Sequence, residues 1–103
     1  MKYVALKFYV NEKQRLHGRL VYEWLLEEAQ KLGVQGGSAY RAVAGFGRHG
    51  KMHEETFFEL AGEMPVQVEF VVEPALADKI SDVVRQHNPG LFYVRHDVEA
   101  GVI

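Results

Sequence analysis

Two stretches in which apolar side chains recur at every second position limit what this chain can fold into. The first runs over residues 2–10 and the second over residues 66–73. A period of two is typical of a strand with one buried face. The apolar positions of the two stretches are Val4, Leu6, Phe8 and Val10, and Val66, Val68, Phe70 and Val72.

Each alternating stretch is followed by a segment with helical spacing. In residues 19–32 the apolar stripe consists of Val21, Leu25, Ala29 and Leu32, and Gly33 marks the end of the helix. A second helix is predicted from Pro74, a residue favoured at the first helical position, to Asn88-Pro89-Gly90. Residues 37–46 and 91–98 are read as two further strands, and residues 47–64 as a long loop.

The order strand–helix–strand, loop, strand–helix–strand places two similar halves in one chain. Right-handed crossovers put both helices on the same face of a four-stranded antiparallel sheet. We therefore predict a ferredoxin-like α+β fold. The 103 residues fit a single domain, residues 1–103.

The face of the sheet without helices is predicted to carry aromatic surface. We expect it to contain Tyr3, Ala5, Tyr9, Val71, Leu91 and Tyr93, mixed with Lys7, Glu69 and Arg95. Such a face indicates a partner subunit, and oligomerisation suits a domain that leaves roughly a third or more of its unfolded surface exposed. The alternative is a solvated face with scattered aromatic residues.

Composition excludes several classes of function. The net charge of −2 gives no support for nucleic-acid or membrane-surface binding. The chain has no cysteine, which excludes disulfides, thiolate catalysis and zinc–thiolate sites. No apolar run approaches the roughly 20 residues that cross a bilayer, so we expect a cytoplasmic protein.

Residues 45–52, GFGRHGKM, match two nucleotide-binding patterns that belong to different folds. The dinucleotide pattern G-x-G-x-x-G requires the turn after a first strand, whereas these glycines follow the second. The phosphate-loop pattern needs a hydroxyl where Met52 stands. Two interpretations remain open, an anion-binding concavity of backbone N–H groups and a plain turn. The candidate effector-binding residues are Arg41, Gly45, Phe46, Gly47, Arg48 and Lys51.

Evidence for other chemistry is sparse. His49 and His53 have helical spacing and are candidates for a metal site, but no third ligand is obvious. The hydroxyl groups of Ser38, Thr56 and Ser81 lie in no recognisable nucleophile motif. We therefore expect no catalytic residues and no enzymatic activity.

The segment Val43-Ala44-Gly45-Phe46-Gly47-Arg48 resembles the base of the long loop in nitrogen-regulatory PII signalling proteins. His17-Gly18, residues 20–25 and Arg41 are similar to a PII-like branch, the domain of unknown function 190 family. The resemblance implies a homotrimer with its sheets packed inward. It also implies small effectors, often adenine nucleotides, bound between subunits, and a loop that signals to a target such as a transporter or enzyme.

One departure concerns ATP. PII proteins grip phosphate with a glycine–lysine pair before the last strand, and here the sequence is Asn88-Pro89-Gly90-Leu91. The resemblance therefore does not extend to that phosphate contact. We expect residues 48–60 to be the most mobile part of the free protein.

The sequence thus predicts a PII-like cytoplasmic regulator that binds a small anionic effector at subunit clefts. Two alternatives are a small oligomeric enzyme of the dimeric α+β-barrel type and a metal-responsive module that uses His49 and His53. The alternatives differ in assembly state and in metal binding.

Overall fold

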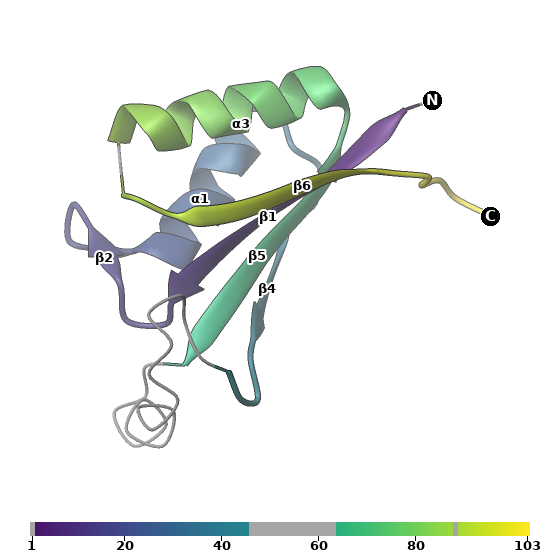
Figure 1. Cartoon of the computed structure of the whole chain (residues 1–103). Coiled ribbons are helices and arrows are strands. Elements are labelled where there is room, and N and C mark those ends of the chain that lie inside the picture. The colour runs from purple at the N-terminus through teal and green to yellow at the C-terminus, as the bar shows by residue number, and fades with distance from the viewer. Residues whose placement is uncertain (1, 46–63, 88) are drawn as a thin grey trace.

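The structure, a computed structural model, describes residues 2–45, 64–87 and 89–103. It confirms the α+β ferredoxin-like fold (Figure 1). In the described part of the chain, no helix is long and apolar enough to cross a membrane. The elements are β1 (Tyr3–Asn11), β2 (Arg15–Leu16), β3 (Arg19–Leu20), α1 (Val21–Lys31), β4 (Ser38–Arg41), β5 (Pro65–Val72), α3 (Pro74–His87) and β6 (Phe92–Val98).

Four strands form one antiparallel sheet in the order β4-β5-β1-β6. Both helices lie on the same side of this sheet (Figure 1). The central pair β1–β5 sets Leu6 opposite Phe70 and Phe8 opposite Val68. All apolar positions of the two alternating stretches are buried under the helices, as the sequence predicts. The core is therefore a single layer between the helices and one face of the sheet.

Helix α1 ends where the sequence predicts. Gly33 has a φ of 94°, the left-handed conformation that glycine adopts at a helix C-terminus. The N–H of Gly33 donates to the Gln30 carbonyl at 3.1 Å, and the N–H of Val34 donates to the Ala29 carbonyl at 3.1 Å. These are the two hydrogen bonds of a Schellman motif, which satisfy carbonyls that the helix leaves open.

A small hairpin between β1 and α1 was not predicted. Its strands β2 and β3 have two residues each, too short for alternation to be visible in the sequence. The turn residues His17 and Gly18 both have positive φ, 54° and 78°, as a tight two-residue hairpin turn requires. The signal that could have found it is the His-Gly dipeptide.

Strand β4 is shorter than the predicted strand over residues 37–46. It covers only Ser38–Arg41 and lies at the edge of the sheet, with all four residues exposed. The predicted loop over residues 47–64 lies outside the described residues, except for the buried Met64 at its end.

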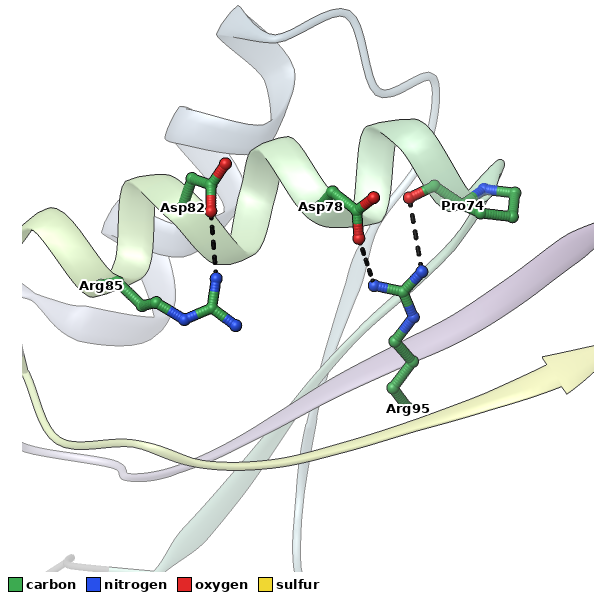
Figure 2. Close-up of polar contacts among 5 residues, drawn as sticks. All are labelled: Pro74, Asp78, Asp82, Arg85 and Arg95. Atoms are coloured by element: carbon green, nitrogen blue, oxygen red, sulfur yellow. Dashed lines mark hydrogen bonds and ion pairs between the residues drawn. The ribbon is translucent and has the colours of Figure 1, made fainter.

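The register of β6 corrects one prediction. Tyr9 lies opposite Phe92, and this places Phe92 on the face without helices and Tyr93 on the helix side. Arg95 also lies on the helix side, where it donates to an Asp78 carboxylate oxygen at 2.7 Å and to the Pro74 carbonyl at 3.5 Å (Figure 2). Leu91 precedes the strand and packs against the core. Leu91, Tyr93 and Arg95 were expected on the other face.

The reason is that the two faces of β6 have similar composition. Phe92 and Val94 alternate with Tyr93 and Arg95, so both faces mix apolar with polar side chains. The ion pair with Asp78 on α3 gives the Arg95 guanidinium a partner that makes the helix side acceptable for a cation. Hydrophobicity alone does not choose between the two registers.

Gly37 is predicted to be essential for core packing. A Cβ at Gly37 would lie 2.5 Å and 2.7 Å from two ring atoms of Phe70, which is 1% exposed and has little room to move. We expect Gly37→Ala to lower the free energy of unfolding by about 1–3 kcal/mol, the usual cost of overpacking. Urea denaturation at one fixed protein concentration measures it.

Gly36→Ala is the matched control, because a Cβ at Gly36 would meet nothing within 4 Å. Its free energy of unfolding should equal that of the wild type or exceed it slightly. Equal stability of the two variants would contradict the packing argument.

Candidate functional site

Three chain segments meet at one end of the sheet, where β1 and β4 finish and β5 begins (Figure 1). The Ala42 N–H donates to the Pro65 carbonyl at 2.8 Å, and the Glu12 N–H donates to the Met64 carbonyl at 2.9 Å. These bonds continue the sheet pairing by one step on each side of β5. We call this group, Glu12, Arg41, Ala42, Met64 and Pro65, the loop base.

The carboxylate of Glu12 joins two parts of the loop base. One oxygen, Oε1, lies 3.2 Å from Nε of Arg41 at the end of β4. The other, Oε2, accepts a hydrogen bond from the Met64 N–H at 3.3 Å, just before β5. The ion pair is partly solvated, since the Arg41 side chain is 58% exposed and that of Glu12 27%. Its contribution to stability is therefore small, at most about 1 kcal/mol.

A hollow of about 290 Å³ lies beside this ion pair, lined by Arg41, Ala42, Val43 and Met64. Arg41 contributes a cation to its wall, and the other three contribute backbone and apolar surface. Small-molecule pockets usually start at about 300 Å³ and enclose most of the ligand. At about 290 Å³ the hollow is close to the lower end of that range.

The predicted effector-binding residues fall into two groups. Arg41 lies at the loop base, and Gly45 lies near it, where an added Cβ would be 3.7 Å from Cγ of Pro65. That distance is ordinary contact, so packing against the described residues does not explain why Gly45 is a glycine. Phe46, Gly47, Arg48 and Lys51 lie outside the described residues, and their role stays a prediction.

The two histidines proposed as metal ligands, His49 and His53, also lie outside the described residues. Over residues 2–45, 64–87 and 89–103, no three side chains of His, Asp or Glu gather in a way that could hold a metal ion.

Sequence reasoning missed Glu12. It follows β1 in a turn where the Lys13 N–H donates to Oδ1 of Asn11 at 2.8 Å and the Gln14 N–H donates to the Asn11 carbonyl at 3.0 Å. The turn residues are recognisable locally, because asparagine commonly accepts such a bond. The partners of Glu12 are distant in sequence, so only the sheet register identifies them.

The face of the sheet without helices is the second candidate surface, and we call it the open sheet face. Tyr9 of β1 and Phe92, the first residue of edge strand β6, pack together on it, with ring centroids 5.8 Å apart. Lys7 and Glu69 lie opposite each other on β1 and β5, with Nζ and Oε2 3.8 Å apart. By register the face comprises Tyr3, Ala5, Lys7 and Tyr9 of β1, Ser38 and Tyr40 of β4, Gln67, Glu69 and Val71 of β5, and Phe92, Val94, His96 and Val98 of β6.

The open sheet face combines exposed apolar side chains with a pair of opposite charges. Tyr9, Tyr40, Val71 and Phe92 are all large and at least one-third exposed. Several large apolar side chains exposed on one face are typical of a contact between proteins. The Lys7–Glu69 pair leaves the centre of the face without net charge, so two copies of it do not repel each other.

Comparison with known proteins identifies relatives along the whole chain. Residues 3–100 match the family model DUF190, described as "Uncharacterized ACR". A UPF0166 protein of Aquifex aeolicus is 28% identical over 99 residues, which is 96% of this chain and 93% of that protein. A UPF0166 protein of Methanocaldococcus jannaschii is 30% identical over 71 residues, 69% of this chain and 65% of that protein.

Solved structures with the same fold are PII-like. CPII of Thiomonas intermedia K12, a nitrogen regulatory PII-like protein bound to ADP and bicarbonate, has a TM-score of 0.70 at 14% identity, covering 99% of this chain and 91% of its own. In another structure CPII is bound to ADP, AMP and bicarbonate, with a TM-score of 0.67, 14% identity and coverage of 100% and 97%. A protein of Thermus thermophilus named for its likeness to PII signalling proteins has a TM-score of 0.63 at 16% identity, covering 95% and 87%.

The hydrogen bond from the Met64 N–H to the Glu12 carboxylate is expected to stabilise the loop base. Glu12→Ala removes the acceptor of the Met64 N–H and the partner of Arg41. We expect it to lower the free energy of unfolding by about 0.5–1.5 kcal/mol, the range for one hydrogen bond. Glu12→Gln keeps an acceptor oxygen and should lower the free energy of unfolding by less than half as much.

Lys13→Ala is the control in the same turn, because only the backbone of Lys13 takes part in the turn's hydrogen bonds. Its free energy of unfolding should stay within about 0.5 kcal/mol of the wild type. If Glu12→Ala were as stable as Lys13→Ala in urea denaturation, the two bonds would contribute nothing to the loop base.

Proposed function

This chain belongs to the DUF190 family, and from that premise we propose that it is a PII-like regulatory protein without catalytic activity. It binds a small anionic effector, an adenine nucleotide being the leading candidate, in clefts between subunits of a homotrimer. Effector binding shifts the population of conformations that engage a target protein, such as a membrane transporter or an enzyme. We place this activity in the cytoplasm.

The hollow at the loop base is the observation that carries the proposal. Its wall contains the Arg41 guanidinium, which forms charge-assisted hydrogen bonds with phosphate and carboxylate groups. The segment that follows carries the glycines and the predicted cations Arg48 and Lys51. The hollow is lined by Val43 and Met64, which stand before and after that segment in the sequence.

The ligands of CPII support an anionic effector. ADP, AMP and bicarbonate are all anions, and CPII shares the fold of this chain across nearly its full length. At 14% identity the comparison supports the fold alone, so the choice among these ligands belongs to experiment. The absence of a lysine in Asn88-Pro89-Gly90-Leu91 makes AMP and bicarbonate better first probes than ATP.

The open sheet face supports the trimer. A sheet with helices on one side only leaves its other side to water or to a second copy. Tyr9, Tyr40, Val71 and Phe92 favour the second copy, because their apolar surface gains from burial. We propose that three such faces pack around one axis, with the effector clefts between neighbouring subunits.

Substitutions of two neighbouring aromatic residues of β6 test assembly through the open sheet face. Phe92 lies on this face and is 45% exposed, whereas Tyr93 lies on the helix side and is 54% exposed. We expect a trimer of the wild type in sedimentation equilibrium at micromolar concentration. Phe92→Glu should shift it to monomers, because a charge is buried without a partner.

Tyr93→Glu is the matched control and should stay trimeric, since it adds the same charge at similar exposure on the other side of the strand. A monomeric wild type would contradict the proposal. A stable dimer would instead support the α+β-barrel alternative.

Effector binding is tested by thermal shift with AMP, ADP, ATP, cyclic nucleotides and bicarbonate, because a ligand of the native state raises its stability. With the ligand that binds, Arg48→Ala should weaken affinity by about 1–3 kcal/mol, the loss of a charge-assisted hydrogen bond. Arg85→Ala, on the exposed side of α3, removes the same charge far from the loop base and should leave affinity unchanged. Equal affinity of wild type and Arg48→Ala would mean that the glycine motif is only a turn.

A further inference from the structure

The cation that the proposed effector would use is already engaged within the chain. The Glu12 carboxylate lies 3.2 Å from Nε of Arg41 through Oε1. A phosphate, a bicarbonate and a carboxylate all bind a guanidinium through the same N–H donors and in the same plane. An anion that binds the Nε side of Arg41 therefore competes with the Glu12 carboxylate for that position.

We propose that Glu12 is an internal competitor for Arg41 and sets the affinity of the loop base for anions. In the free protein the Glu12 carboxylate lies against the Nε side of the guanidinium, and an anionic effector that uses this side binds by displacing it. The proposal rests on the proposed function, because it assigns a residue to the same site. It adds a binding-site residue that lies outside the glycine motif.

The second bond of Glu12 explains why its carboxylate stays at the site after displacement. Oε2 accepts the Met64 N–H at 3.3 Å, and the Glu12 N–H donates to the Met64 carbonyl at 2.9 Å. The residue is thus tied to the start of β5 independently of Arg41. A displaced carboxylate remains close to the bound anion and repels it, which favours effectors that bring further hydrogen bonds over simple ions.

Partial solvation makes the displacement feasible. The Arg41 side chain is 58% exposed, so the guanidinium can turn toward the hollow without leaving a buried charge unpaired. A fully buried pair would be broken only at a large cost, and an unpaired Arg41 would bind anions without selection. The Glu12–Arg41 pair is partly exposed, so it is neither a fully buried pair nor an unpaired cation.

The variant Glu12→Gln distinguishes competition by the Glu12 charge from the structural role of its hydrogen bond with Met64. Glutamine removes the negative charge while its amide oxygen can still accept the Met64 N–H. We expect AMP to bind Glu12→Gln about threefold to tenfold more tightly than the wild type, because the competing charge is gone. Arg41→Gln should weaken AMP binding, and removal of the Glu12 charge in that background should strengthen binding less than it does in the wild type, since competition for Arg41 is then absent.

The measurement is calorimetric titration of the full chain with AMP at about 0.15 M ionic strength, where distant charges are screened, with ADP and bicarbonate as parallel probes. Glu99→Gln makes the same change in net charge at an exposed residue after β6, at the other end of the sheet, because the preceding Val98 pairs with Tyr3. Its affinity should stay within about twofold of the wild type, because screening removes most of its effect at that distance. An increase in Glu12→Gln alone therefore reports on the site and not on overall charge.

Each outcome distinguishes the two proposals. If Arg41→Gln weakens binding and Glu12→Gln leaves it unchanged or weaker, the effector site stands and Glu12 is not a competitor. Wild-type affinity in Arg41→Gln overturns this inference and leaves effector binding elsewhere in the protein intact. If none of the three probes binds the wild type or Glu12→Gln, this inference fails, and the proposed function is then decided by ATP and the cyclic nucleotides of the thermal-shift screen.

Discussion

The burial of one face of the central strand pair β1–β5 is the constraint on which the rest of the structure depends. Leu6 and Phe70 lie opposite each other in this pair and are 0% and 1% exposed. A slip of one residue would move every apolar side chain of a strand to the other face. The same alternation therefore also determines what the open sheet face presents, including the Lys7–Glu69 pair and Tyr9.

The register of this pair also builds the loop base. Asn11 lies opposite Pro65, so Glu12, the residue after β1, lies opposite Met64 and donates its N–H to the Met64 carbonyl. Arg41 lies opposite Val66 on the other side of β5, and this brings its guanidinium to the same carboxylate. A contact among three distant segments thus follows from the strand pairing without any further loop structure.

The sequence predicted those elements whose apolar pattern is decisive. Strands β1 and β5 and both helices have one clearly apolar side, and Gly33 ends α1 through backbone chemistry that the residue type reveals. Strand β6 could not be oriented, because its two faces are equally mixed and the Arg95–Asp78 ion pair forms only in the folded chain. Glu12 was missed for a similar reason, since its partners are set by strand pairing. Arg41 was identified through family likeness and not through its contacts.

Assembly and effector binding are physically linked in a protein built this way. In the proposed assembly a second copy covers the exposed apolar side chains of the open sheet face and contributes to the cleft that holds the effector. A ligand that touches two subunits binds the assembled protein only, and it must stabilise that assembly by the same free energy by which assembly strengthens its binding. For the proposed trimer, effector affinity then depends on protein concentration wherever the assembly dissociates. The Glu12–Arg41 pair acts inside one chain, so its competition with the anion is independent of that concentration, and the two influences on affinity can be separated by dilution.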